Sequence, residues 1–421
     1  MRPPALSLAI EAAQASTQPK ATRCVRWLAA PLLVAATAAV IVSRETDAPY
    51  LWTAIASVVL LSSAVFMTRR PALRALWMNL VVVVGTFGAA EAYMWLAEPF
   101  ERRMEYSGEF FIGDEMLGYR PAPGQSFSHR TSVREGLLYR ANYTINADGL
   151  RAASPEDATT AGLPCVAFFG DSFTFGEGVD NDQTMPYQVW KRLGGRYRVV
   201  NFGFLGYGPH QMLAALQDNQ LESRGHCRPQ HVIYQTIPAH LSRSAGLELW
   251  DSHGPRYVLE PTGRLVLAGH FDDAPPSGAL DHLRAMHRRL STGWKKALER
   301  SALYRTLLRS HRPASDHDLL LYSGIIGTAR NVVEEKYPDV EFHLLLWDYG
   351  EARKEVERIE RALEARRIDV TPMSAILPDF PARHERYEIH PDDRHPNALA
   401  HELIARYVAE RLVGGPKLIS R

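Results

Sequence analysis

The chain has 421 residues, of which 46% are hydrophobic, so it is longer than one ordinary domain and can bury a sizeable core. Its 48 Lys and Arg residues nearly balance its 47 Asp and Glu residues, which gives a formal net charge of +1. Proteins that bind nucleic acid need clustered basic residues to neutralise phosphates. The even balance therefore argues against a nucleic-acid partner.

The first hundred residues contain three apolar runs, Trp27–Ser43, Tyr50–Thr68 and Ala75–Ala97. Each is close to the ~20 residues that a helix needs to cross the hydrocarbon layer of a membrane. We predict three transmembrane helices within residues 1–105. A cleaved signal peptide is the alternative for the first run, but the two runs that follow favour an uncleaved anchor. Glu91 lies inside the third run, where a carboxylate needs a partner or access to the interface.

Positive charge predicts how these spans are oriented. Basic residues precede the first run, and Arg69, Arg70 and Arg74 fill the turn between the second and third. The first turn holds only Arg44, beside two acidic residues. Because basic loops stay on the cytoplasmic side, we expect a cytoplasmic N-terminus in the inner membrane. The chain after Glu98 should then lie outside the cytoplasm, which in a bacterium is the periplasm.

The remainder of the chain has the pattern of an α/β domain. Turn residues and alternating polar and apolar residues in 106–160 predict a small β element. From 161 to 421, strand-like apolar runs alternate with helical patterns, which predicts a parallel sheet covered by helices on both faces. The expected strands are Val166–Phe169, Arg198–Phe202, His231–Thr236, Glu341–Trp347 and Ile368–Val370. An insertion at about 245–312 includes a basic helical region that either faces solvent or touches an anionic lipid or glycan.

The candidate nucleophile is Ser172, in the stretch Val166 to Gly178. Apolar residues lead to Gly170-Asp171-Ser172, where the backbone must turn before a helix begins. A hydroxyl at the carboxyl end of a strand stands clear of the sheet, where a substrate can reach it. Gly, Asp and Ser are also ordinary turn residues, so this stretch alone does not define a site.

A candidate general base lies near the end of the chain. Pro396 suits the first position of a helix, which places His395 at the positive end of the helix dipole and favours a neutral imidazole. Asp392, three residues earlier, can curl back to bond the other ring nitrogen and fix the tautomer. The alternative is a metal pair, but His390 does not complete a convincing zinc site, so we expect no metal.

Three blocks taken together resemble the SGNH/GDSL hydrolase superfamily. They are Phe-Phe-Gly-Asp-Ser-Phe-Thr-Phe-Gly at 168–176, Asn-Phe-Gly-Phe-Leu-Gly-Tyr-Gly at 201–208 and Asp-Asp-Arg-His-Pro-Asn at 392–397. The resemblance covers about residues 164–413. It implies a flavodoxin-like α/β/α fold that performs ester hydrolysis or acyl transfer without a metal or other cofactor.

The same resemblance implies roles for individual residues. It implies that Ser172 is the nucleophile, that His395 is the base and that Asp392 is the partner of the base. The implied oxyanion donors are the backbone amides of Ser172 and Gly206. One block departs, because Ile-Pro-Ala-His240 stands where the family has Gly-x-Asn-Asp, and the usual asparagine donor is missing. Either His240 supplies the donor, the substrate differs, or the domain is catalytically weak. The alternative for His240 is a ring that only packs or hydrogen-bonds in a loop.

Three functions stay open at this point. The first is a membrane-anchored esterase that acts on an acylated glycan or lipid. The second is an O-acyltransferase that modifies an exported polysaccharide, with a partner membrane protein supplying the acyl donor. The third is a non-catalytic membrane assembly factor that keeps the fold.

The sequence also predicts a disulfide. Cys165 and Cys227 each precede a strand, the first and the third, and these strands are neighbours in a flavodoxin-like order. The predicted compartment is oxidising, which permits a disulfide between them. Two buried thiols are the alternative.

Overall fold

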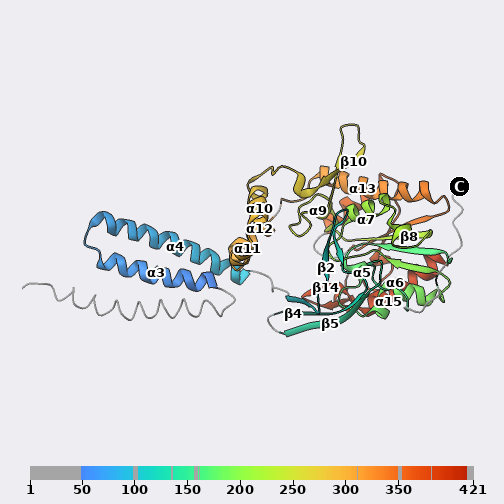
Figure 1. Ribbon diagram of the computed structural model, residues 1–421, viewed down its shortest axis with the longest axis horizontal. Helices are drawn as coiled ribbons and strands as arrows, with labels where there is room; N and C mark the ends of the chain where they lie inside the picture. Colours follow the sequence, from blue (N-terminus) through green and yellow to red (C-terminus); the bar gives the residue numbers. More distant parts are fainter. Residues whose placement is uncertain are drawn as a thin grey trace, which may run out of the picture. The chain divides into compact units, whose positions relative to one another are not determined.

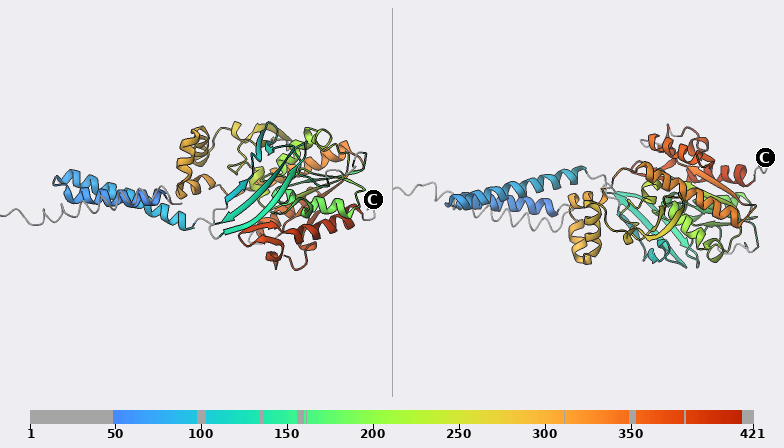
Figure 2. Two further views of the ribbon diagram at one scale, coloured as in Figure 1. Left: turned by 60° about the horizontal axis from the view of Figure 1, so that its bottom comes forward. Right: turned by 90° about the horizontal axis from the view of Figure 1, so that it is seen from above.

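The computed structural model describes residues 49–97, 103–133, 136–155, 160, 162–310, 312–348, 353–380 and 382–414. The chain divides into two compact units, which are drawn in Figures 1 and 2. The first unit comprises Met1–Pro99 and Gly278–Ser310, and the second comprises Phe100–Ser277 and His311–Arg421. The predicted insertion is therefore shared, because its helical part belongs to the first unit and its earlier part to the second.

The first unit contains a hairpin of two apolar helices, α3 (Pro49–Met67) and α4 (Pro71–Ala97). Both are long and apolar enough to cross a membrane, by length and composition. Side chains such as Val82 and Val83 are 65% and 64% exposed, unlike those of a core helix in a soluble protein. They correspond to the second and third predicted spans. The first predicted span, 27–43, lies outside the described residues.

Three short helices complete the first unit. They are α10 (Ala279–Arg289), α11 (Thr292–Glu299) and α12 (Ala302–Arg309). Glu91 of α4 is buried and caps the N-terminus of α12. Its carboxylate accepts hydrogen bonds from Ser301 Oγ at 2.7 Å and from the backbone amides of Ala302 at 2.7 Å and Leu303 at 3.1 Å. Glu91 thus has the partner that a carboxylate in an apolar run requires.

A five-stranded parallel sheet forms the centre of the second unit, in the order β12-β11-β8-β6-β7. Its strands are β6 (Cys165–Phe169), β7 (Arg198–Asn201), β8 (Pro229–Thr236), β11 (Glu341–Leu346) and β12 (Val370–Pro372). Numbered along the chain and read from β7, the order is 2-1-3-4-5, which is the flavodoxin-like arrangement. The predicted parallel α/β sheet is confirmed.

Helices cover both faces of this sheet, with an apolar core on each side. On one side lie α7 (Pro209–Gln217), α13 (Asp316–Lys336) and α14 (Arg353–Glu364), and on the other α6 (Met185–Arg192) and α15 (Ala398–Tyr407). Residues of β6 alternate between the cores, because successive side chains of a strand point to opposite faces. Val166 and Phe168 enter one core, while Ala167 and Phe169 enter the other. This double burial explains why the strand reads as a continuous apolar run.

Shorter elements connect these layers. They are α5 (Ser172–Phe175), α8 (Gln220–Ser223), α9 (His240–Ser244), the hairpin of β9 (Pro255–Leu259) and β10 (Leu265–His270), and the hairpin of β13 (Glu388–His390) and β14 (Asp393–Pro396). Single helical turns occur at Asn181–Gln183, Phe271–Asp273, Met373–Ala375, His384–Tyr387 and Val408–Val413. The first turn of α5 and the strand β14 supply the candidate catalytic residues.

The predicted β element is present and belongs to the second unit. It consists of β1 (Arg103–Tyr106), β4 (Gln125–Val133) and β5 (Gly136–Ile145) in one antiparallel sheet, and of β2 (Phe111–Asp114) and β3 (Gly118–Pro121) in a hairpin. Arg151 bridges to Ile145 at the end of β5 and to Asn201 at the end of β7. The β element therefore adjoins the parallel sheet, near the carboxyl end of β7.

A disulfide joins Cys165 to Cys227, with their Cα atoms 5.6 Å apart. Cys165 begins β6, and Cys227 lies just before β8, which pairs with β6. These are the two cysteines that the sequence pairs. The bridge closes a 62-residue separation and so restricts the unfolded chain more than the folded one.

Candidate active site

Ser172 lies in a sharp turn between β6 and α5. Gly170 has a φ of +152°, and a Cβ added there would lie 2.2 Å from Thr174 Oγ1, so only glycine fits. Asp171 caps α5 by accepting a hydrogen bond from the backbone amide of Phe173 at 3.0 Å. Together these features place the Ser172 side chain at the carboxyl end of the strand, where doubly wound sheets bind ligands.

The structure brings Ser172 together with His395, 223 residues later in the chain. His395 Nε2 lies 2.8 Å from Ser172 Oγ. The other ring nitrogen, Nδ1, is hydrogen-bonded to the carboxylate of Asp393. The same carboxylate accepts a hydrogen bond from the backbone amide of His395 at 3.1 Å. Asp393 is fully buried. Serine, histidine and aspartate are thus arranged as a triad, in which a carboxylate can orient an imidazole that can accept a hydroxyl proton.

The prediction of Asp392 as the carboxylate is wrong in this geometry. Asp392 is exposed, and its carboxylate lies 3.4 Å from His390 Nδ1 rather than beside His395. The reason is the local backbone, which is a strand from Asp393 and not the curled loop that would bring Asp392 to His395. In β14, residues two apart point to the same side, so Asp393 and His395 meet.

A second carboxylate, Glu177, also reaches the imidazole. Its Oε2 lies 3.2 Å from His395 Nε2, and its Oε1 accepts a hydrogen bond from the Tyr139 hydroxyl at 3.1 Å. Tyr139 comes from β5, so the β element contributes to the site. A buried anion at this distance stabilises the positive charge that His395 acquires when it takes a proton. Glu177 was not predicted from the sequence, although a glutamate between two glycines directly after the nucleophile turn is a local signal for it.

Arg151 holds the loop that carries Glu177. It is buried, and its guanidinium donates hydrogen bonds to the carbonyls of Phe175 at 2.8 Å and Val179 at 2.7 Å. The guanidinium also stacks 4.3 Å from the centroid of the Tyr143 ring. Burial lowers the pKa of Arg151 to about 10, which still leaves it charged at neutral pH. The two carbonyls that it binds lie more than twenty residues later in the chain, so no local pattern marks Arg151 for this role.

Arg243 connects the nucleophile turn to the loop after β7. Its Nη1 donates to the Asp171 carboxylate at 2.8 Å and to the Tyr207 carbonyl at 2.7 Å. Burial by itself would raise the pKa of the Asp171 carboxyl, but His240 and Arg243 outweigh this and hold the pKa well below its usual range. Asp171 is therefore an anion, and its hydrogen bonds to the Phe173 amide and to Arg243 hold the turn that carries Ser172. Nothing in the sequence marks Arg243 for this role.

His240 does not occupy the position predicted for it. It is fully buried, with Nδ1 2.7 Å from the Tyr234 hydroxyl and 3.0 Å from Thr236 Oγ1, and with Nε2 3.2 Å from the Asp171 carboxylate. Burial lowers the pKa of His240 to about 4, so the ring is neutral at pH 7. Both nitrogens face buried groups, and the ring supports the turn instead of facing a substrate. Ala239, one residue earlier, is exposed and has no side-chain donor.

Gly206 lies in the loop after β7, with a φ of +76°. A Cβ added at Gly206 would lie 2.6 Å from the Tyr119 hydroxyl and 2.7 Å from Trp250 Nε1, so these side chains would have to shift, and the positive φ itself favours glycine. Asn201 ties this loop to α5, since its amide donates to the Thr174 carbonyl at 3.1 Å while its oxygen accepts a backbone amide of the loop at 3.0 Å. The backbone near Gly206 is thereby fixed beside the nucleophile helix.

Comparisons with family profiles and with curated protein sequences give no match. Among solved structures, the chain is similar to a protein from Desulfitobacterium hafniense DCB-2 described as lipolytic and of the G-D-S-L family, with 12% identity, a TM-score of 0.32 and coverage of 58% of this chain and 98% of that one. It is also similar to the acetyl xylan esterase Est2A from Butyrivibrio proteoclasticus, with 10% identity, a TM-score of 0.33 and coverage of 75% and 84%. The chain is similar, too, to a carbohydrate esterase family 2 enzyme from Corynascus thermopiles, with 14% identity, a TM-score of 0.32 and coverage of 75% of this chain and 87% of that one. At these values the fold assignment rests on the strand order described above.

Proposed function

We propose that this chain is an SGNH-type serine ester hydrolase that acts on an O-acyl ester of a glycan or lipid. One observation carries the proposal. Ser172 Oγ lies 2.8 Å from His395 Nε2, while the buried Asp393 holds the opposite nitrogen of the same ring. Such an array activates a hydroxyl for attack on a carbonyl, and it stands at the edge of a doubly wound sheet where ligands bind.

The reaction follows from these positions. His395 takes the hydroxyl proton as Ser172 Oγ bonds to the ester carbonyl carbon, and Asp393 stabilises the imidazolium. The backbone amides of Ser172 and Gly206 are the donors proposed for the oxyanion. When the intermediate collapses, the ester C–O bond breaks and His395 protonates the departing alcohol. A water molecule then attacks the acyl-serine and gives one proton to His395. His395 passes this proton to Ser172 Oγ as the acyl–Oγ bond breaks and the acid leaves.

The membrane location is part of the same proposal. The α3–α4 hairpin and the basic residues at Arg69, Arg70 and Arg74 favour an inner-membrane anchor with the second unit outside the cytoplasm. The disulfide between Cys165 and Cys227 supports this side, because disulfides persist in oxidising compartments. The substrate would then be an exported glycan or an envelope lipid.

Acyl transfer to a sugar hydroxyl is the second candidate. Ser172 is 6% exposed, which restricts the access of water to an acyl-serine and favours an acceptor that is bound in the site. In that case a partner membrane protein would supply the acyl donor. The Ser172, His395 and Asp393 array supports both catalytic functions over a non-catalytic assembly factor.

The test uses the full chain in detergent micelles with p-nitrophenyl acetate, with and without a xylo-oligosaccharide acceptor. Release of p-nitrophenolate by the wild type and only background release by Ser172→Ala is the expected result. Acetylated oligosaccharide detected by mass spectrometry would assign transfer, and free acetate alone would assign hydrolysis. Equal rates for the wild type and Ser172→Ala would overturn the proposal.

A further inference from the structure

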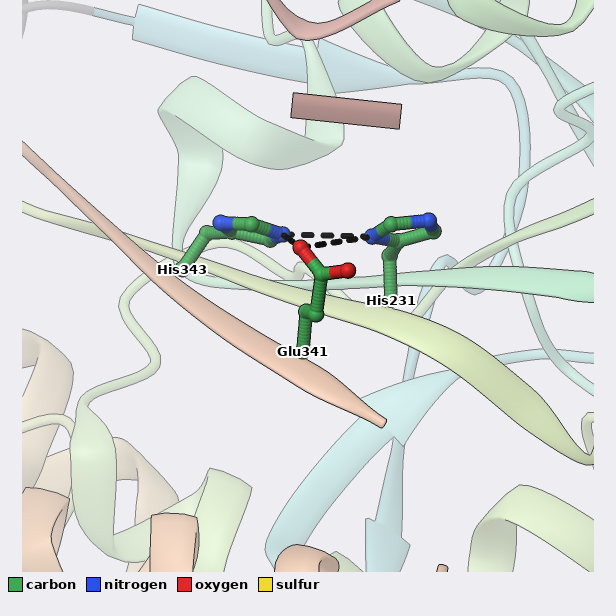
Figure 3. A group of neighbouring side chains, drawn as sticks. All are labelled: His231, Glu341 and His343. Atoms are coloured by element: carbon green, nitrogen blue, oxygen red, sulfur yellow. Dashed lines mark hydrogen bonds and ion pairs between the residues drawn. The ribbon is translucent and has the colours of Figure 1, made fainter. Parts of the chain in front are cut away.

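A second cluster of reactive side chains lies on the parallel sheet. It consists of His231 in β8 and of Glu341 and His343 in β11. The two strands are neighbours, and Glu341 is paired with His231 in the register. Glu341 and His343 are two residues apart, so both point to the same face as their partner across the ladder. Figure 3 shows the two imidazole rings facing each other, with the carboxylate of Glu341 directed between them.

This cluster is separate from the candidate active site. His231 and Glu341 lie near the amino-terminal ends of their strands, whereas Ser172 follows the carboxyl end of β6. All strands of this sheet are parallel, so the two sites lie at opposite edges. Any ligand of the cluster therefore takes no part in the chemistry at Ser172.

The three ligand atoms are spaced for one metal ion. His231 Nδ1 and His343 Nε2 are 3.2 Å apart, and Glu341 Oε2 lies 3.8 Å from His343 Nε2 and 4.0 Å from His231 Nδ1. A triangle with these sides has a centre that is about 2.1 Å from each corner, which matches the ~2.0–2.2 Å that zinc takes to histidine nitrogen and carboxylate oxygen.

A hydrogen bond between the rings does not account for all three positions. It would explain the 3.2 Å contact between the nitrogens, but not the convergence of the carboxylate on the same two atoms. The carboxylate is too far from either nitrogen for a hydrogen bond, at 3.8 and 4.0 Å. A cation shared by the three groups explains why the Glu341 carboxylate approaches both ring nitrogens without a hydrogen bond to either of them.

Burial and donor chemistry indicate the kind of ion. The His231 and His343 side chains are 7% and 16% exposed, so the packing fixes the rings, while Glu341 is 40% exposed and leaves one side open for an ion to enter. Two imidazoles and one carboxylate suit zinc, which keeps a fourth position for water in such sites. Calcium and magnesium prefer sets of six or more oxygens, and this cluster offers too few.

We propose that His231, Glu341 and His343 bind one zinc ion, with water as the fourth ligand. The ion would cross-link β8 to β11 at the edge of the sheet away from Ser172. Because zinc would bind the folded chain and not the unfolded one, it should raise the thermal midpoint of unfolding. Its removal should lower that midpoint without abolishing ester hydrolysis.

The experiment uses the full chain in detergent, purified with a tag that contains no histidine, stripped with EDTA and titrated with Zn²⁺ by calorimetry. We expect one zinc ion per chain and a higher thermal midpoint in the bound form. Glu341→Gln is nearly isosteric at a half-exposed position, and it should weaken zinc binding by at least about 10-fold with an unchanged circular dichroism spectrum. Substitution of Co²⁺ should give visible absorption bands in the wild type that Glu341→Gln and His343→Gln lose.

A matched control is available at another histidine pair. The His253 ring stacks on His270 at 4.0 Å between centroids and lies 3.1 Å from the Asp272 carboxylate, so it is a second place where zinc could bind. His253→Gln should leave the stoichiometry and the affinity unchanged. Loss of zinc in His253→Gln, wild-type affinity in Glu341→Gln, or no stoichiometric binding by the wild type would each overturn the proposal.

Discussion

At the scale of single residues, the choice of carboxylate decides whether the imidazole can act as a base. Asp393 is buried and bonded to His395 Nδ1, while Asp392 is exposed beside His390. Asp393→Asn should present the wrong tautomer of His395 and lower kcat/KM for p-nitrophenyl acetate by about 10²–10⁴. Asp392→Asn should stay within about threefold of the wild type, since exposed substitutions of this kind are usually mild. The reverse ranking would restore Asp392 as the catalytic carboxylate.

The missing amide donor gives a second prediction at this scale. Ala239 is exposed at the end of β8, so Ala239→Asn adds an amide without overpacking the core. If this position is where the family places its asparagine, the substitution should raise kcat about 10-fold, a part of the 10²–10³ that one oxyanion donor contributes. Steady-state kinetics of Ala239→Asn beside Ala239→Leu separates the amide from the added volume. An equal kcat in both variants would place the oxyanion elsewhere.

Residues close in sequence to a recognisable motif could be predicted, and residues that meet only through the fold could not. Ser172 and His395 stand in blocks with local signatures, and the structure brings them within hydrogen-bonding distance. The prediction of Asp392 was wrong by one residue. Whether Asp392 or Asp393 faces His395 depends on whether the segment is a loop or a strand, which the sequence does not decide. Arg243 reaches the site through contacts between distant segments, which the order of the residues does not reveal. Glu177 differs, because it lies directly after the nucleophile turn and could have been predicted.

At the scale of elements, the contact between Glu91 and α12 organises the first unit. The carboxylate accepts three hydrogen bonds from the first turn of α12, which satisfies amides that would otherwise lack partners. Glu91→Ala should destabilise this turn by about 1–3 kcal/mol and speed amide exchange at Ala302 and Leu303 by at least about 10-fold. Hydrogen exchange with mass spectrometry on the full chain measures this. Glu91→Gln keeps an acceptor oxygen and should show a smaller change, whereas unchanged exchange in Glu91→Ala would contradict the capping role.

The strands of the second unit were predictable because each is a short apolar run bounded by turn residues, as in Cys165–Phe169 and Pro229–Thr236. The assignment of the basic helices at 279–309 to the first unit could not be predicted from the sequence. The last of them, α12, contacts the first unit through Glu91, which lies 210 residues before Ser301. A sequence pattern reports which face of a helix is apolar but not which distant element covers it.

At the scale of the whole molecule, buried neutral histidines make stability depend on pH. Burial lowers the pKa of His240 to about 4 and that of His401 to about 3. In the unfolded chain both return to ~6.5, so below that pH the unfolded state binds protons that the folded state does not. Stability should therefore be complete above about pH 6.5 and fall as the pH drops toward 4, by about 1–2 kcal/mol per histidine at pH 5.

Urea unfolding of the full chain, followed by near-ultraviolet circular dichroism at pH 7 and pH 5, tests this dependence. His401→Gln removes one such group and should reduce the loss of stability between these pH values. His226→Gln is the control, because that ring is exposed. Equal stability of the wild type at pH 7 and pH 5 would show that these rings are not neutral and buried in the folded protein.

The most direct test of the central claim is covalent labelling of Ser172. A fluorophosphonate ester reacts with a serine hydroxyl only where a base activates it, and peptide mapping by mass spectrometry locates the adduct. We expect one adduct per chain at Ser172 in the wild type and its loss in His395→Ala and Ser172→Ala, both with unchanged circular dichroism spectra. An unlabelled wild type, or labelling of Ser172 that persists at the same rate in His395→Ala, would contradict it.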